Sequence, residues 1–256
     1  MASPPTFNLN AEILGNEIVT IHVGPKRKSF TIHKKLLCER SSYFQKAFAG
    51  GFKEGAEGVM YMDEEDAGTF DNLINWIYRD QLPSFPSKDF EDSVDGWCEF
   101  AGTIMAPLFF MAEKFCINEL CNKIMDEFQD GDLRSGVAPD LEEITTAYAD
   151  THEKSKLRKY CAMMTIYTVA FMGENSKYRR EIVEDGLLSE LLKSTPDFAT
   201  DFTILQCTYG FRFRAPKNTD PRRRTGSRSF GQCFFHTHSK GEVCHLGPEK
   251  KTKEKV

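Results

Sequence analysis

Residues 30–44 read F-T-I-H-K-K-L-L-C-E-R-S-S-Y-F, and this stretch decides how the fold is predicted. It opens as a strand, because Phe30 and Ile32 alternate with polar neighbours and therefore lie on one face. From His33 onward the apolar spacing becomes that of a helix, with Leu37 in its first turns. The stretch therefore predicts a strand that passes directly into a helix.

A second helix is expected immediately afterwards. Ser41 or Ser42 is placed to cap it, since a serine hydroxyl accepts a hydrogen bond from a free N–H group of the first helical turn. Tyr43, Phe44 and Phe48 follow at positions that a helix brings together. The strand and both helices carry apolar faces, which indicates a small sheet covered by helices.

Further elements extend this core in both directions. Residues 17–23 alternate and pair with 29–33 as a predicted hairpin, and 59–62 reads as a short strand. Residues 66–78 have the i, i+3, i+4, i+7 spacing of an amphipathic helix. Residues 80–106, rich in Pro, Ser and acidic residues, are expected to form a surface excursion.

Helices are predicted to dominate the rest of the chain up to residue 210. The expected segments are 108–115, 117–128 with a stop at Asp130-Gly131, 141–149, 157–171, 187–192 and 198–209. Periodicity ends at Phe211, so residues 211–256 are expected to form a basic, disordered tail.

Several motifs in this order resemble the BTB/POZ domain family. They are the 30–44 stretch, F-K-E at 52–54, L-I-N-W-I-Y at 73–78 and L-F-F-M-A-E-K-F at 108–115. The resemblance implies an α+β fold, a small mixed sheet covered by a helical cluster, over residues 10–129 with an insertion at about 80–106. A helical region over 130–210 and the tail over 211–256 are expected to follow.

The resemblance also implies function. BTB/POZ proteins associate with themselves or with partner chains, and some dock on a cullin scaffold as substrate adaptors of ubiquitin ligases. The residues expected to build the interaction module, or to hold its structure, are Phe30, His33, Leu37, Ser42, Tyr43, Phe44 and Phe48. No nucleophile with an ordered base and no phosphate-binding glycine loop is evident, so we expect no enzyme and no small-molecule substrate.

The C-terminal segment C-F-F-H-T-H-S-K-G-E-V-C carries the one candidate cofactor site, and it resembles the Cys/His strings of fungal family members. Cys233, His236, His238 and Cys244 form a C-x2-H-x-H-x5-C pattern. Thiolates and imidazoles are the ligands of tetrahedral zinc, so the pattern is a candidate zinc knuckle. A disordered tail with coincidental Cys and His residues is the alternative.

The tail differs from the body in charge. Residues 211–256 carry 12 Lys/Arg against four acidic residues, whereas the whole chain has a net charge of −5. The cluster R-R-R-T-G-S-R at 222–228 could serve nuclear import or nucleic-acid binding, or simply be solvated. The alternative function is therefore a nuclear regulatory factor. The interleaved Phe residues suit stacking on bases or a tail that packs back onto the body.

The compartment follows from the N-terminus and the cysteines. The first residues, M-A-S-P-P-T-F-N-L-N, lack the basic start and apolar block of a secretory signal, and no apolar run has the length of a membrane span. We expect a cytoplasmic or nuclear protein whose eight cysteines are reduced, with no membrane contact.

Overall fold

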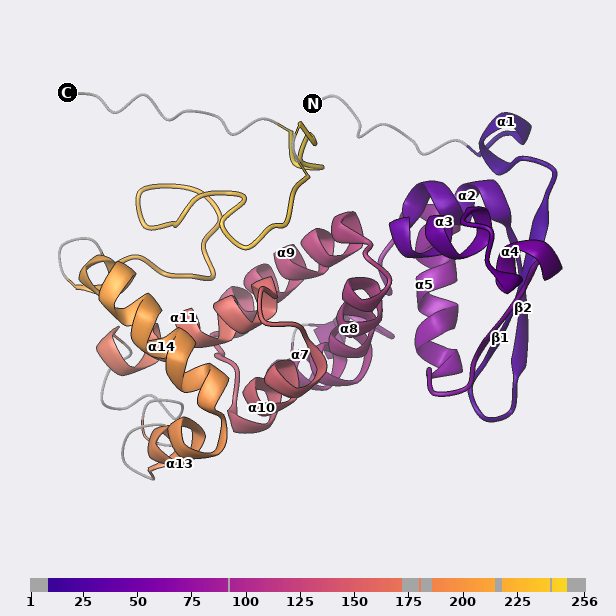
Figure 1. The fold of residues 1–256 in the computed structure, drawn as a ribbon. Coiled ribbons are helices and arrows are strands. Elements are labelled where there is room, and N and C mark those ends of the chain that lie inside the picture. Colours follow the sequence, from indigo (N-terminus) through magenta and orange to yellow (C-terminus); the bar gives the residue numbers. More distant parts are fainter. Residues whose placement is uncertain are drawn as a thin grey trace. The chain divides into compact units, whose positions relative to one another are not determined.

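The computed structural model describes residues 9–91, 93–171, 180, 186–214, 218–239 and 241–247 (Figure 1). The chain divides into two compact units, which are considered separately. Unit 1 comprises residues 1–84 and 104–120, and unit 2 comprises residues 85–103 and 121–256. Within the described residues, no helix is both long enough and apolar enough to cross a bilayer.

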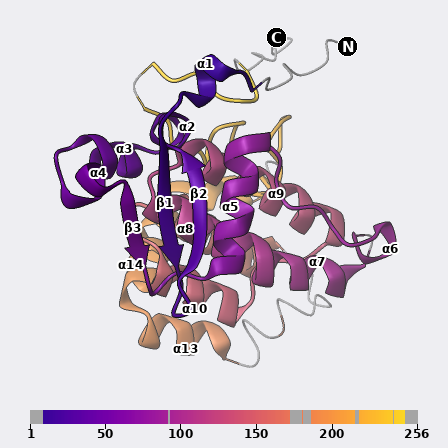
Figure 2. The same cartoon turned by 90° about the vertical axis from the view of Figure 1, so that its right-hand side faces the viewer.

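Unit 1 is built on a mixed three-stranded sheet, as predicted. Strand β1 (Ile18–Val23) is central, antiparallel to β2 (Lys28–His33) and parallel to β3 (Val59–Met62) (Figure 2). Ile21 of β1 lies opposite Phe30 on one neighbouring strand and Met60 on the other, and all three side chains are buried. The register therefore aligns these three apolar side chains in one row across the sheet.

The remaining elements described in unit 1 are helices. They are α1 (Ala11–Leu14), α2 (Lys34–Arg40), α3 (Ser42–Ala49), α4 (Lys53–Glu57), α5 (Ala67–Arg79) and α8 (Ala106–Lys114). Helix α5 begins after Asp66, whose carboxylate accepts the Thr69 N–H at 2.7 Å. It buries Phe70, Leu73 and Ile77 of its predicted apolar face, together with Trp76, whereas Ile74 of that face is only partly buried. The α+β fold class is thus confirmed.

Ser41, and not Ser42, caps helix α3. Its hydroxyl oxygen accepts the Phe44 N–H at 3.2 Å and its O–H donates to the Phe115 carbonyl at 2.6 Å, so the cap also ties α3 to the end of α8. Ser42 is the exposed first residue of the helix. Serine at the cap position satisfies one free N–H group, and only the residue with extended backbone geometry can do so.

Unit 2 is helical. Its elements are α6 (Lys88–Glu91), α7 (Val94–Phe100), most of α9 (Asn118–Ser135), α10 (Leu141–Asp150), α11 (Lys156–Phe171), α13 (Leu187–Ser194), α14 (Pro196–Tyr209) and a 3-10 turn (Gly210–Phe213). A π-helical turn (Ala101–Met105) and the first residues of α9 connect the two units along the chain. The helices predicted between residues 141 and 209 are all present.

The prediction of a surface excursion over residues 80–106 is wrong for much of this segment, because residues 85–103 are a folded part of unit 2. Trp97 and Phe100 of α7 are buried, and the ring centroids of Phe85 and Phe100 lie 4.1 Å apart. The Pro, Ser and acidic residues predicted a loop, but the aromatic residues between them bury enough apolar surface to form a small core.

The predicted helix stop at Asp130-Gly131 is wrong, since α9 continues to Ser135. A Cβ atom on Gly131 would overlap the ring of Trp97. Trp97 also donates its indole N–H to Asp132 Oδ1 at 2.8 Å, one residue further along α9. Gly131 is therefore a contact surface for the indole and not a terminator, because only a residue without a side chain lets the ring approach the helix.

We predict that Gly131→Ala destabilises the protein even though alanine is the better helix former. The added methyl group displaces Trp97 and should lower the free energy of unfolding by about 1–3 kcal/mol. Gly102→Ala is the matched control, because nothing lies within 4 Å of a Cβ at that position. Urea unfolding of both variants measures the difference, and equal stability would show that Trp97 does not pack on Gly131.

Candidate metal centre

Residues 218–239 and 241–247, called here the clasp, pack onto helices of unit 2. The clasp has an irregular backbone, as its lack of periodicity predicts. The prediction that these residues are disordered is wrong, because several of them are buried. Phe235 is 1% exposed and meets the Tyr160 ring edge-on, with ring centroids 5.2 Å apart. Missing periodicity excludes a helix or strand; it does not exclude packing by aromatic and hydrogen-bonding side chains.

The clasp brings together all four residues of the predicted zinc pattern. One ligand atom from each of Cys233, His236, His238 and Cys244 lies within 4.8 Å of the others. A tetrahedral zinc ion with bonds of about 2.0–2.3 Å would hold such atoms about 3.3–3.8 Å apart. The group therefore fits this ion after small side-chain movements, and its two thiols and two imidazoles are a donor set of structural zinc sites.

His236 is oriented as a metal ligand would be. Its Nε2 lies 2.9 Å from Asp126 Oδ1 on α9, while its Nδ1 faces Cys244 Sγ at 3.5 Å. The ring thus has one nitrogen directed into the cluster and the other held by a carboxylate. This is the carboxylate–histidine arrangement that fixes the tautomer of metal-bound imidazoles.

His238 supplies independent support for the same interpretation. Both of its ring nitrogens are shielded from solvent, and among the described residues neither has a hydrogen-bond partner. The nearest carboxylate oxygen, Glu242 Oε1, lies 3.6 Å from Nδ1, which is beyond hydrogen-bonding distance. Buried polar atoms without partners are rare in folded proteins, and a metal ion would satisfy one of these two.

Asp126 connects the candidate site to the basic cluster. It contacts His236, His245 Nε2 at 2.7 Å and Arg224 Nη1 at 3.3 Å. Burial opposes its ionisation, but hydrogen bonds from the two imidazoles and the charge of Arg224 hold the pKa of Asp126 below its ordinary value. The carboxylate is therefore ionised, and two imidazoles and one guanidinium contact it.

Two amides on α9 fasten the clasp on either side of the site. Asn122 clamps the backbone of Thr237, accepting its N–H at 2.7 Å and donating to its carbonyl at 3.0 Å. Gln129 donates to the Pro221 carbonyl at 2.6 Å. Sequence reasoning missed these residues. The available signal was a row of polar side chains at i, i+4 and i+7 on a helix that is otherwise largely apolar on its buried side.

The arginine cluster at 222–228 is partly used by the fold. Arg222 is 7% exposed, donates twice to Asp220 at 3.0 Å, and donates to the Val137 carbonyl at 2.9 Å. Arg224 is paired with Asp126 and Asp130. Arg223 remains exposed. The docked clasp therefore does not present the cluster as a continuous basic surface.

Phe230, Phe234 and Phe235 of the interleaved aromatic residues pack back onto the body, one of the two interpretations left open by the sequence, whereas Phe211 is 59% exposed. Phe230 and Phe234 stack with centroids 4.7 Å apart, and both rings meet Tyr209 edge-on. Lys159 Nζ lies 3.4 Å from the Phe234 centroid. Burial among these rings lowers the pKa of Lys159 to about 8, and the cation–π contact offsets part of that cost.

The residues predicted for the interaction module lie in unit 1, whereas the metal group belongs to unit 2. Phe30, Leu37, Phe44 and Phe48 are core residues, and Tyr43 is 38% exposed. His33 Nδ1 lies 2.8 Å from the Tyr78 hydroxyl, which also accepts the His33 backbone N–H at 3.0 Å. His33 thereby joins the end of β2 to α5.

Residues 19–130 match the family model of the BTB/POZ domain. This part of the chain is a BTB/POZ domain. The resemblance inferred from the motifs is therefore confirmed at the level of the family, and the BTB/POZ domain is a protein–protein interaction module that implies protein partners and self-association. A search of curated proteins finds no match to the chain. The family match ends inside α9, which continues beyond the BTB/POZ domain to Ser135.

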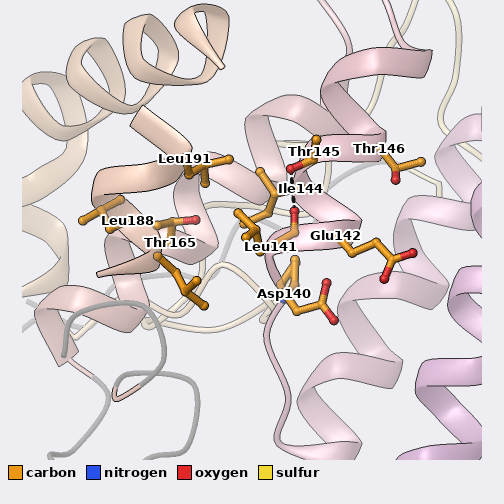
Figure 3. A pocket seen from close by; sticks show the side chains of 11 residues that line it. Asp140, Leu141, Glu142, Ile144, Thr145, Thr146, Thr165, Leu188 and Leu191 are labelled. Carbon is orange, nitrogen blue, oxygen red and sulfur yellow. Dashed lines mark hydrogen bonds between the residues drawn. The ribbon is translucent and has the colours of Figure 1, made fainter. Parts of the chain in front are cut away.

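A separate pocket of about 520 Å³ lies between α10, α11 and α13 (Figure 3). Leu141, Ile144, Leu188 and Leu191 give it an apolar wall, and the Thr145 hydroxyl is already bonded to the Leu141 carbonyl. Its described lining contains neither His nor Cys. The pocket therefore contributes nothing to the candidate metal centre.

The buried carboxylate of Asp132 on α9 accepts hydrogen bonds from two aromatic side chains of unit 2. Trp97 donates to its Oδ1 at 2.8 Å and Tyr160 donates to its Oδ2 at 2.7 Å. Burial raises the pKa of Asp132 from 3.8 to about 6, although these hydrogen bonds and the nearby Arg222 act in the opposite direction. The folded protein thus retains this proton at pH values where an unfolded aspartate has lost it.

We predict that Asp132 makes stability fall as the pH rises from about 4 to 6. The folded state binds the proton up to about pH 6 and the unfolded state only up to about 3.8, so the free-energy difference reaches about 3 kcal/mol above pH 6. Asp132→Asn keeps an acceptor for Trp97 and removes the titration. In urea unfolding, the free energy of unfolding of the variant relative to that of the wild type should be higher at pH 7 than at pH 4. A pH-independent difference would contradict the raised pKa.

Proposed function

We propose that this protein is a non-enzymatic adaptor whose BTB/POZ domain docks on a cullin-type scaffold. The observation that carries the proposal is Phe52, whose side chain is 59% exposed at the start of α4, while most aromatic residues of unit 1 are buried. Phe52 belongs to the F-K-E motif of the family resemblance. Aromatic side chains are enriched among the residues that dominate binding energy at protein interfaces, so an exposed Phe on an interaction module supports a docking role.

Two further features support the adaptor role. Tyr43, on helix α3, is a second exposed aromatic residue of unit 1, at 38%. Unit 2 adds a helical body with its own core, which a bridging protein would use for a second partner. None of the eight cysteines, all of which the structure describes, forms a disulfide, which supports the proposed cytoplasmic or nuclear setting.

We predict that Phe52→Ala weakens binding of the full chain to a purified cullin scaffold at least about tenfold, since truncating an interface aromatic costs more than about 1.4 kcal/mol. Ile204→Ala is the matched control, because Ile204 is 56% exposed on α14. Titration calorimetry measures both affinities, and light scattering records self-association of the free chain. Absence of binding by the wild type, or equal losses in both variants, would exclude this docking mode.

The docked clasp does not favour the alternative of a nuclear factor that binds nucleic acid. Arg222 and Arg224 are engaged by carboxylates and backbone carbonyls of unit 2, and Phe234 and Phe235 are engaged by other rings and by Lys159. Stacking platforms and phosphate contacts both need such side chains to be free. An adaptor therefore remains the function that the geometry supports best.

We also propose that the cofactor of the clasp is a single structural zinc ion held by Cys233, His236, His238 and Cys244. The two thiolates favour zinc over magnesium or calcium, which take oxygen ligands. When bound, the ion would satisfy one ring nitrogen of His238 and cross-link four residues of an irregular backbone segment.

We predict about one zinc ion per purified chain, lost in Cys233→Ser and in Cys244→Ser because each removes one of four ligands. Cys207→Ser, at an exposed position on α14, is the control and should retain the ion. Elemental analysis after dialysis against a weak chelator measures the content. A wild-type protein with only traces of zinc, unchanged by the substitutions, would show that the four residues are not a metal site.

A further inference from the structure

We infer that the metal ion acts as a latch: its binding and the docking of the clasp onto α9 are coupled, so that metal loss releases the Arg222–Arg228 cluster. This inference rests on the zinc site proposed above and adds a regulatory role to it. Metal binding and docking of the clasp depend on some of the same residues, and these residues support the inference.

His236 is the first shared residue. It is 3% exposed, with one ring nitrogen facing the cluster and the other 2.9 Å from Asp126. A metal-bound Nδ1 leaves the proton on Nε2, where Asp126 can accept it. Coordination therefore selects the tautomer that docks on α9, and docking places the ring where it can coordinate.

Thr237 is the second shared element, although it is not a ligand. It separates His236 from His238 and is held by Asn122 through both its N–H and its carbonyl. A backbone clamped at this point fixes the spacing of the two imidazoles. In the released clasp the ligands belong to an irregular chain, and binding an ion there must include the cost of ordering it.

The metal-free docked state carries an unfavourable feature that the ion reduces, because the ion takes one of the two His238 nitrogens. The nitrogens of His238 are shielded from solvent without hydrogen-bond partners among the described residues. Release lets water reach them. Because the ion binds the docked form more tightly, metal at about a hundred times its Kd multiplies the docked-to-released ratio about a hundredfold. By the same linkage, docking raises metal affinity by the factor by which metal binding raises docking.

The arginine cluster lies on the same clasp and reports its state. In the docked form Arg222 is buried against the Val137 carbonyl, and Arg224 is paired with Asp126, the carboxylate that holds His236. Release frees both side chains to join the exposed Arg223 and Arg228. Metal loss thereby converts a cluster used within the fold into a mobile basic segment.

Trypsin tests the latch, because it cleaves after arginine in accessible chain. In the full-length protein, removing zinc should speed cleavage after Arg222–Arg224 at least about tenfold. Cleavage at Lys26–Lys28, in the exposed hairpin turn of unit 1, should keep its rate and serves as the internal reference. Cleavage after buried Arg158 should also stay slow.

Asn122→Ala supplies the decisive variant, since it leaves all four ligands in place. Zinc-loaded Asn122→Ala should be cleaved faster at the cluster, and its zinc affinity should fall as well, because docking and metal binding are coupled. Asn75→Ala, an exposed position on α5, is the matched control and should change neither.

The outcomes separate the two proposals. A chain without zinc overturns the site and the latch together. Stoichiometric zinc, with cleavage at the cluster unchanged on its removal or with Asn122→Ala weakening docking but not zinc affinity, overturns the latch alone. An equal rise in cleavage after Arg158 would also overturn it, because the ion would then support the whole of unit 2.

Discussion

The buried polar face of α9 is the constraint on which unit 2 depends. A helix can bury amide and carboxylate groups only if each finds a hydrogen-bonding partner, because an unmet group costs about 1–3 kcal/mol. The partners come from the clasp at Thr237, His236 and Pro221, and from helix α7 at Trp97. The polar groups on α9 that impose this requirement are Asn122, Asp126, Gln129 and Asp132. Two segments that read as loops in the sequence are thus required parts of the core.

This arrangement gives α9 two roles. The match to the BTB/POZ domain family includes α9 up to residue 130, and the polar side chains that hold the clasp, Asn122, Asp126 and Gln129, lie within this matched part. The interaction module and the helical unit therefore share one continuous helix. Changes in how the clasp docks act on a segment that belongs to the BTB/POZ domain, which gives the candidate metal centre a physical connection to the interaction module.

Sequence reasoning succeeded where short-range patterns determine structure. The strand-to-helix stretch at 30–44, the face of α5 and the helices between 141 and 209 follow from apolar spacing alone. The metal group could be named because its four ligands lie within twelve residues of each other. Gly131 was misjudged because a glycine that ends a helix and one that admits an indole look alike without knowledge of Trp97. Asn122 and Asp126 were missed because their partners lie far along the chain.

The separation of those partners also bears on how the protein is made. The clamp between Asn122 and Thr237 joins residues 115 positions apart, and the pair of Asp126 and His236 spans 110. Translation proceeds at roughly 5–20 residues per second, so α9 waits seconds on the ribosome before the clasp emerges. During that interval its polar groups are hydrated and neighbouring apolar surface is open. Contacts of such high contact order form late. Unit 2 is therefore the part of the nascent chain that would most need a chaperone.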